Sequence, residues 1–181
     1  MALAATDGKG VRHRQRIATR DRLFKAAMSE FRRVGYAHAK IQRIADLAGT
    51  SVGSFYFHFP DKEDVLIEQV ERAARDMAHQ LRDATKPRSV RGFLLRVVDW
   101  LVRDELQVGG ALFRDIMAAI ARNRANRDWI GELYAADLTQ FLRERQAAGE
   151  VRPDLTPEVL NRVFFTSVAG YLTEPPRRLR G

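Results

Sequence analysis

The sequence IQRIADLAGTSVGSFYFHF, residues 41–59, predicts two short helices joined by a tight turn. In the first helix, residues 41–48, apolar side chains recur every three or four positions and would form one buried face. Gly49 can adopt the left-handed backbone conformation that ends a helix, and Ser51 can cap the second helix with its hydroxyl group. Two helices that cross steeply through a short glycine-containing turn form a helix-turn-helix, whose second helix can enter the DNA major groove. The alternative is an ordinary helical hairpin in a bundle, so the flanking sequence has to decide.

Positive charge is concentrated in the same part of the chain. Residues 1–60 contain eleven Lys or Arg and four Asp or Glu, so they carry +7 of the net charge of +8. The other 121 residues contain 20 basic and 19 acidic side chains and are almost neutral. A basic segment indicates a polyanionic partner, either a nucleic acid or an anionic membrane surface.

The composition excludes several classes of protein. With 181 residues, 45% of them apolar, the chain can bury a core and is not disordered as a whole. It has no cysteine, which excludes disulfides, thiolate zinc sites and cysteine nucleophiles. The sequence contains no signal peptide and no apolar run near the roughly 20 residues of a membrane span, so we expect a cytoplasmic protein.

A covering helix is predicted on the N-terminal side. An apolar stripe opposite a face of arginines predicts an amphipathic helix over residues 11–34, which Gly35 would end. The two-helix unit needs a third helix over its core, and this favours a packed helix over one lying on a membrane. We expect residues 1–11 to form a flexible basic arm. Its continuation, Arg12 to Arg16, would either follow the DNA backbone or remain a solvated tail.

On the C-terminal side, Pro60 and the acidic residues after it predict the start of a helix that reaches about residue 84, with Asp61 as its cap. Four more segments of helical periodicity follow, separated by breaks that contain glycine or proline, and the last covers residues 156–172. No alternating β pattern competes with them. We therefore expect an all-α protein of about eight helices, with a three-helix domain over residues 12–60 and a helical bundle over residues 61–181.

With these features in view, the sequence resembles the TetR family of transcriptional regulators. The resemblance rests on FRRVGY, residues 31–36, and on IADLAGTSVGSFYFHFPDKEDVL, residues 44–66, in which a recognition helix runs into a lysine-bearing cap. It is close over residues 12–70 and elsewhere extends only to the number and order of helices. It implies a homodimer that binds a palindromic operator through its N-terminal helix-turn-helix domains. It also implies a repressor without a cofactor, released when its C-terminal domain binds a small-molecule effector.

The resemblance also assigns DNA contacts to individual residues. The implied contacts are Lys40, Gln42, Arg43, Ser51, Val52, Gly53, Ser54, Tyr56, His58 and Lys62. Residues 52–54 would lie nearest the bases, whereas Tyr56 and His58 would hydrogen-bond phosphates. Lys62 would meet a phosphate as a point charge. His58 is equally compatible with a structural hydrogen bond, and Phe55, Phe57 and Phe59 are expected to be mostly core.

Two departures from the family pattern affect these assignments. Ala39 and Lys40 stand where the family usually places a Ser or Thr cap, and a lost cap costs about 1 kcal/mol. Either His38 replaces the cap or the helix start frays. Alternatively, Lys40 stands at this position to contact a phosphate. The recognition helix also lacks Arg, Asn and Gln, the side chains that make bidentate base contacts. Specificity would then depend on Gln42, Arg43 and DNA shape, and affinity on the neutralisation of phosphates.

The C-terminal residues point less clearly to a site. The family places a ligand pocket there, and the candidate lining residues are Phe93, Trp100, Phe113, Met117, Trp129, Tyr134 and Phe164. Aromatic residues at helical spacing are more often core packing, which is the alternative for each of them. The family typically dimerises through its last two helices, whereas here only the helix at residues 156–172 corresponds to one of them, so either a helix is missing or the interface differs. We expect the helix at residues 156–172, with help from the one at residues 129–149, to form the interface.

An enzyme is not expected. The four histidines have no metal-binding spacing, no glycine-rich loop has the context of a phosphate site, and no serine lies in a nucleophile elbow. The remaining alternative is a basic helical protein that binds nucleic acid or anionic surfaces without sequence preference. Such a protein would bind any duplex equally, whereas an operator reader should discriminate by at least ~10³.

Overall fold

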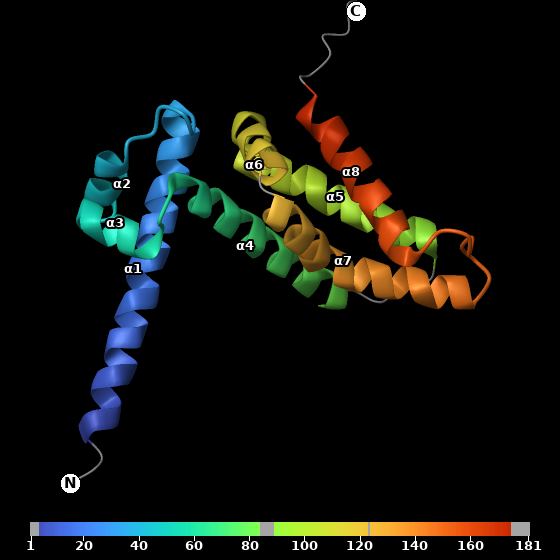
Figure 1. The fold of residues 1–181 in the computed structure, drawn as a ribbon, viewed down its shortest axis with the longest axis horizontal. Helices are drawn as coiled ribbons and strands as arrows, with labels where there is room; N and C mark the ends of the chain where they lie inside the picture. The colour runs from blue at the N-terminus through green and yellow to red at the C-terminus, as the bar shows by residue number, and fades with distance from the viewer. Residues whose placement is uncertain (1–3, 84–88, 123, 175–181) are drawn as a thin grey trace, which may run out of the picture. The chain divides into compact units, whose positions relative to one another are not determined.

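The computed structural model describes residues 4–83, 89–122 and 124–174, with side chains for residues 10–80, 89–122 and 136–174. Within this part of the chain there are eight helices and no strand, which confirms the predicted all-α class (Figure 1). The chain divides into two compact units, Met1–Val65 and Leu66–Gly181. None of the helices searched in the described part is long and apolar enough to span a membrane.

The N-terminal unit consists of α1 (Ala4–Val34), α2 (Ile41–Leu47), α3 (Val52–His58) and the first turn of α4 (Lys62–Asp83). α1 is longer than the sequence indicated, because it is helical from Ala4 across most of the segment expected to be a flexible arm. It ends as predicted at Gly35, whose φ of 82° lies in the left-handed region.

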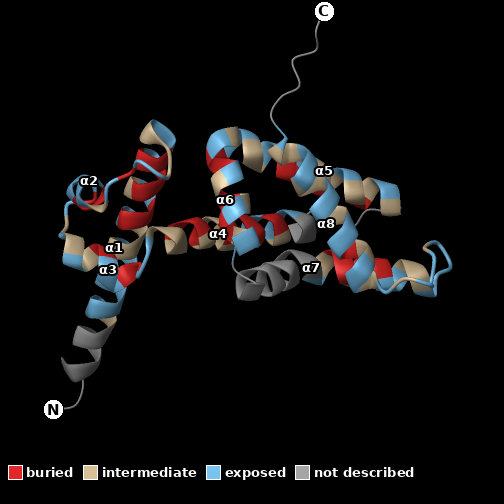
Figure 2. Ribbon diagram, turned by 45° about the horizontal axis from the view of Figure 1, so that its top comes forward, coloured by how far each residue is buried: buried red, intermediate tan, exposed pale blue. Residues whose placement is uncertain are grey.

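The core of this unit forms where the three helices meet. α1 contributes Leu23, Ala27 and Phe31, α2 contributes Ile44 and Ala45, and α3 contributes Phe55, with Phe59 directly after it; each is at most 1% exposed. Figure 2 shows this buried side of α1 in red against the helix-turn-helix. Burying one such aromatic or aliphatic side chain contributes about 1.5–3 kcal/mol. Ala45 supplies the small side chain that a close helix crossing requires.

Local hydrogen bonds fix the ends of the short helices. The turn after α2 passes through Gly49, whose φ is 64°, and Ser51 Oγ accepts a hydrogen bond of 3.1 Å from the backbone N–H of Ser54. α4 begins with a reciprocal pair of caps: Asp61 Oδ1 accepts from the N–H of Glu63 at 2.9 Å, and Asp64 Oδ2 accepts from the N–H of Asp61 at 2.8 Å. These contacts confirm the predicted caps.

The C-terminal unit contains the rest of α4 together with α5 (Val90–Val108), α6 (Gly110–Arg122), α7 (Arg124–Ala147) and α8 (Pro157–Thr173). Its core cluster combines buried residues of α4, α5 and α7 with half-buried residues of α8. Phe93 of α5 stacks on Phe141 of α7 with ring centroids 4.4 Å apart. α7 and α8 form a hairpin that is closed by the ion pair between Arg143 and Glu158 at 2.9 Å.

Candidate nucleic-acid interface

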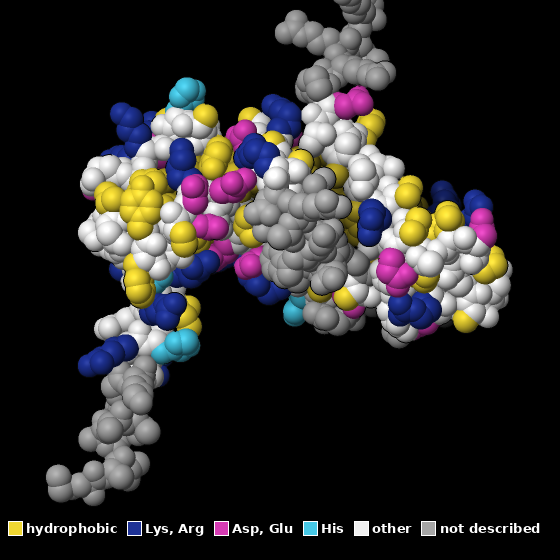
Figure 3. Space-filling view, viewed as in Figure 1, with side chains coloured by type: hydrophobic (Ala, Val, Ile, Leu, Met, Phe, Trp, Pro, Cys, Tyr) yellow, Lys and Arg dark blue, Asp and Glu magenta, His cyan; other side chains and the backbone are white. Residues whose placement is uncertain are grey.

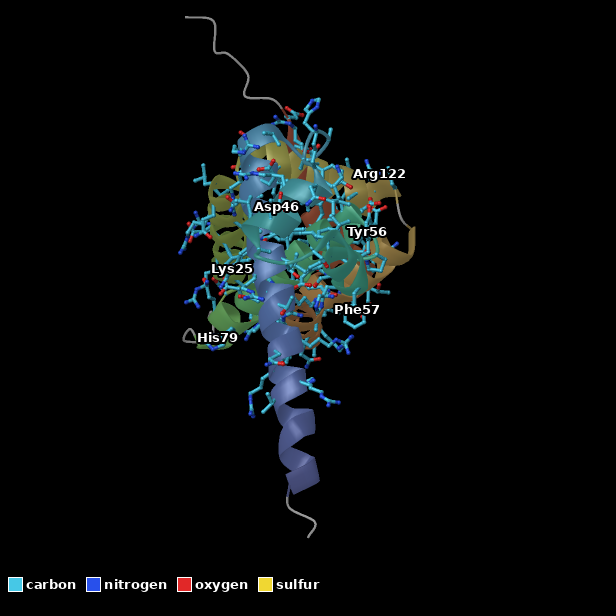
Figure 4. All side chains as sticks on the ribbon, turned by 90° about the vertical axis from the view of Figure 1, so that its left-hand side faces the viewer. Lys25, Asp46, Tyr56, Phe57, His79 and Arg122 are labelled. Atoms are coloured by element: carbon cyan, nitrogen blue, oxygen red, sulfur yellow. The ribbon has the colours of Figure 1, made fainter. Side chains whose placement is uncertain are left out.

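α3 has a buried face and an exposed face. Phe55, together with Phe59 just beyond the helix, anchors it to the core, whereas Tyr56 and Phe57 are 51% and 69% exposed. Figure 4 shows Tyr56 and Phe57 on one side of α1, with Lys25 on the other. The expectation that Phe57 belongs to the core is therefore wrong: it lies on the outer face of the helix.

The first turn of α3 presents only small side chains. Ser51 and Gly53 are exposed, and Val52 and Ser54 are half-buried. The hydroxyl of Ser51 is used by its cap on the N–H of Ser54, so this residue has a clear structural role. A surface of this kind can approach base edges closely, but it offers few hydrogen bonds for reading a sequence.

The N-terminal end of α2 carries three exposed candidates for DNA contact. Lys40 is the N-cap residue, and its side chain makes no capping hydrogen bond, which agrees with the predicted loss of the cap. Gln42 donates from Nε2 to Oδ1 of Asp46 at 2.9 Å, one turn along the same helix. Lys40, Gln42 and Arg43 are all exposed and can reach a phosphate or a groove edge.

Lys62 occupies a different position from the one that the family pattern implied. Its Nζ donates to the carbonyl oxygens of Tyr36 at 3.0 Å and Ala39 at 3.1 Å, with Ala37 at 3.5 Å. The same ammonium group lies 4.9 Å from the centroid of the Tyr36 ring. Lys62 thus ties the loop between α1 and α2 to the start of α4, and its three donors point into the protein. These contacts give Lys62 a structural role, and its phosphate contact stays a prediction.

His58 is likewise placed inside the unit, because its side chain is only 7% exposed. Burial lowers the pKa of His58, and the neighbouring charges of Arg20 and Arg16 lower it further. Protonation of the imidazole is therefore disfavoured at the C-terminal end of α3. Of the two roles left open for His58, this buried position supports the structural one.

Two arginines of α1 lie against α3, and the sequence indicated neither of these contacts: Arg16 was placed only in a basic segment, and Arg20 was not singled out. A guanidinium nitrogen of Arg20 donates to the backbone carbonyl of His58, and this guanidinium lies 4.3 Å from the centroid of the Phe59 ring. The guanidinium of Arg16 lies 5.5 Å from the centroid of the exposed Phe57 ring. Arg20 thus supplies a cation at the C-terminal end of α3, where the helix dipole favours it. In sequence, both residues look like any other arginine of α1.

Arg16 and Arg20 of α1 and Lys40 and Arg43 of α2 place basic side chains on the helices beside α3, and we call them the basic surface. Figure 3 shows Lys and Arg side chains along the described N-terminal part of α1, near hydrophobic side chains of the helix-turn-helix. Of the candidate DNA contacts, Lys40, Gln42, Arg43, Ser51, Gly53 and Tyr56 are exposed, and Val52 and Ser54 are half-buried. His58 and Lys62 instead maintain the fold. The arrangement suits contact with a polyanion, with α3 as the element that can enter a groove.

The candidate pocket residues of the C-terminal unit are mainly packed into its core. Phe93 and Trp100 are buried in the core cluster and Phe164 packs against it, whereas Phe113 is buried on α6 and Met117 is half-buried. The side chains of Trp129 and Tyr134 lie outside the described residues. Core packing, the alternative stated for these residues, therefore describes Phe93 well.

A small polar cavity of about 70 Å³ lies between α4 and α5. It is lined by Asp76, Gln80, Trp100, Arg103, Asp104 and Gln107. Asp76 accepts hydrogen bonds at Oδ2 from Gln80 Nε2 at 2.8 Å and from Trp100 Nε1 at 3.1 Å. Burial, with a smaller contribution from the charge of Asp76, raises the pKa of Asp104 to about 6.

Comparison with known proteins identifies the N-terminal unit. Residues 23–68 match the family model described as bacterial regulatory proteins, tetR family. The chain is 31% identical over 121 residues to the HTH-type transcriptional regulator TcmR of Streptomyces glaucescens, an alignment that covers 64% of this chain and 54% of TcmR. It is 26% identical over 162 residues to the HTH-type transcriptional repressor DhaR of Mycobacterium sp. strain GP1, covering 86% of this chain and 81% of DhaR.

Solved structures share the fold of this chain. The crystal structure of FadR from Thermus thermophilus, a TetR-family transcriptional repressor in complex with lauroyl-CoA, superposes with a TM-score of 0.65 at 22% identity. That superposition covers 88% of this chain and 86% of FadR. The family match falls on the helices that form the basic surface, and the structural match extends over both units. Residues 23–68 therefore match the TetR family of bacterial regulatory proteins, and curated transcriptional regulators resemble the chain over a longer stretch.

Proposed function

We propose that this protein is a sequence-specific DNA-binding transcriptional repressor, which acts in the cytoplasm as a homodimer on a palindromic operator. The observation that carries this proposal is that α3 is anchored on one face and exposed on the other. One face of the helix is fixed to the core through Phe55, its start is capped by Ser51, and its other face is exposed beside arginines of α1. A rigid helix with a free face and a basic surround is what the major groove of DNA can accept.

Phosphate contacts would supply most of the affinity. Lys40 and Arg43 are exposed at the start of α2, and the first turn of α3 offers Val52 for a thymine methyl group but no bidentate side chain. Gln42 would read a groove edge once it is released from Asp46, to which it is bonded at 2.9 Å. We therefore expect binding that weakens steeply with salt, and specificity that depends partly on DNA shape.

Dimerisation would use the outer face of α8. Three apolar side chains lie exposed along this helix, with Val159 at 41%, Val163 at 58% and Tyr171 at 78% exposure, and Gly170 beside the last of them would permit close approach of a second helix. The variant Val163→Glu should shift a dimer to a monomer in sedimentation velocity experiments. Leu106→Glu on α5, where Leu106 is 72% exposed, is the matched control and should leave the dimer intact.

A small-molecule effector would act on the C-terminal unit. α4 starts in the N-terminal unit with Lys62 and contributes Ala73 and Met77 to the core of the C-terminal unit. A ligand that repacks the aromatic residues around Phe93 or Trp100 would therefore act on a helix that also holds the loop before α2. The lauroyl-CoA bound by the related FadR makes acyl-CoA thioesters one class to include in a screen.

The proposal is tested by selecting genomic DNA fragments with the purified protein and footprinting the best of them. A footprint of two related half-sites, about one helical turn or a multiple of it apart, is the expected result. Compounds are then tested for release of that fragment. The absence of any enriched fragment would contradict the proposal.

A further inference from the structure

The described N-terminal part of α1 extends beyond the packed body of the helix-turn-helix. Every residue from 11 to 18 is exposed, on all sides of the helix, so this part of α1 buries no face against the rest of its unit. Figure 1 shows α1 continuing past α3 towards the N-terminus. A helix that is unpacked on every side gains no stability from burial in the free protein, so contact with a partner would stabilise it.

The charge of this segment is of one sign. Between Asp7 and Asp21 the sequence contains five Lys or Arg and no acidic residue. Arg12, Arg16 and Arg20 are spaced four residues apart and therefore lie in one row along the helix, whereas Arg14 lies on the opposite side. We call Arg12, Arg16 and Arg20 the arginine row.

The arginine row is placed directly beside α3. Arg20, the member of the row nearest the packed part of α1, donates a hydrogen bond to the backbone carbonyl of His58 at the C-terminal end of α3. The next, Arg16, lies 5.5 Å from the ring centroid of the exposed Phe57. Arg12 follows one turn further out, about 6 Å along the helix axis. The row therefore leads from the C-terminal end of α3 outwards along α1.

The width of the DNA major groove determines which part of the duplex the arginine row would contact. The major groove is about 12 Å wide, and a helix with its side chains is about 10–12 Å in diameter, so a helix in the groove fills it. Any group on the flank of that helix then lies at the wall of the groove, which is the sugar-phosphate backbone. Guanidinium groups bind phosphate in a bidentate manner, and this makes arginine well suited to that position.

We propose that Arg12 and Arg16 bind the phosphates of the DNA strand beside the groove that α3 enters, so that the projecting end of α1 contacts DNA in addition to α2 and α3. This inference rests on the proposed function, because it requires α3 to enter DNA. Arg20 is the structural base of the row, and Arg12 and Arg16 are its DNA-binding members. Arg14, on the other side of the helix, does not take part.

The segment thus provides its own matched control. Arg12→Gln and Arg14→Gln remove the same charge from neighbouring positions of the same exposed helix. Arg12 is exposed, so its substitution should also leave the helix-turn-helix folded. The conservative variant Arg12→Lys keeps the charge and should retain most of the phosphate contact.

The experiment measures the affinity of each variant for the selected DNA fragment, by fluorescence anisotropy, over a series of salt concentrations. Each lost phosphate contact should reduce the slope of log affinity against log salt by about 0.9, equivalent to about eightfold in affinity between 1 M and 0.1 M salt. Arg12→Gln should lose one contact in each DNA-bound subunit, and the double variant Arg12→Gln with Arg16→Gln should lose two. Arg14→Gln should keep the slope of the unmodified protein. Circular dichroism checks that each variant is folded.

The outcomes separate this inference from the proposed function. If the unmodified protein selects no fragment, the proposed function fails. If it selects one but Arg12→Gln and Arg14→Gln behave alike, the function stands and the assignment of the arginine row is overturned. The assignment is also overturned if Arg12→Gln leaves DNA binding unchanged but abolishes binding to vesicles of phosphatidylglycerol, because the row would then serve an anionic membrane surface.

Discussion

Substitution of Lys62 by Met should destabilise the N-terminal unit by about 2–3 kcal/mol. Methionine keeps the length and the apolar stem of the side chain but removes the ammonium group. The carbonyl oxygens of Tyr36 and Ala39 then lose donors at 3.0 and 3.1 Å, and the Tyr36 ring loses its cation at 4.9 Å. Hydrogen bonds that involve a charged group contribute about 1.5–3 kcal/mol each, and a cation–π contact about 0.5–1 kcal/mol. Water reaches the half-buried site and offsets part of the sum.

Urea denaturation followed by circular dichroism measures the change, and salt-dependent DNA binding separates the two roles considered for Lys62. We expect lower stability and an unchanged salt slope, because the donors of Lys62 point to the loop before α2. Lys40→Met is the control: Lys40 is exposed and makes no cap, so its loss should change stability by less than about 0.5 kcal/mol. Unchanged stability in Lys62→Met, with a salt slope reduced by about 0.9, would refute this account and restore the phosphate contact.

Three further results are expected. Lys40→Ser should stabilise the protein by about 1 kcal/mol in urea denaturation, because it adds a cap to α2, yet it should weaken DNA binding by removing a basic side chain. The stability of the protein should fall as the pH drops below about 6.5, because the pKa of the buried His58 is lowered and the unfolded chain therefore binds a proton more readily than the folded one. This loss of stability should be smaller in His58→Gln. Burial raises the pKa of Asp104 to about 6, so the stabilising contribution of its protonated form is lost as the pH rises through that value. Asp104→Asn should therefore raise the stability at pH 7 by about 1 kcal/mol, after allowance for solvent screening, and by less at pH 5.

The sequence predicts most of the helix ends because they depend on nearby residues. The cap of α3 by Ser51 and the turn at Gly49 involve groups within a few positions of each other, and such motifs are visible in a sequence. The missing cap of α2 could be predicted for the same reason. The N-terminal extension of α1 could not, because glycines at positions 8 and 10 argue against a helix that the structure nevertheless begins at Ala4.

The roles of individual basic residues depend on contacts between distant segments. Lys62 bonds to carbonyl groups 23 to 26 positions earlier, and Arg20 bonds to one 38 positions later. No local pattern distinguishes these side chains from lysines and arginines that remain free for a ligand. The exposure of Phe57 could not be predicted either, since apolar residues are usually but not always buried.

The structure therefore divides the basic residues of the DNA-binding unit into two groups. Lys62 and Arg20 hold the loop before α2 and the end of α3, and Arg33 pairs with the buried Glu30 at 2.7 Å. Lys40 and Arg43 remain exposed next to the helix-turn-helix. Net charge alone thus overstates the number of cations that can bind phosphates, and the salt slope should be smaller than the eleven basic residues of positions 1–60 would suggest.

The central claim is that α3 and its basic surround read a particular DNA sequence. Its most direct test is a competition titration at physiological salt, in which the selected fragment is displaced by the same fragment with its half-sites scrambled. We expect the selected fragment to bind at least ~10³-fold more tightly than the scrambled one. Equal affinity for the two duplexes would contradict it and would make the protein a basic binder without sequence preference.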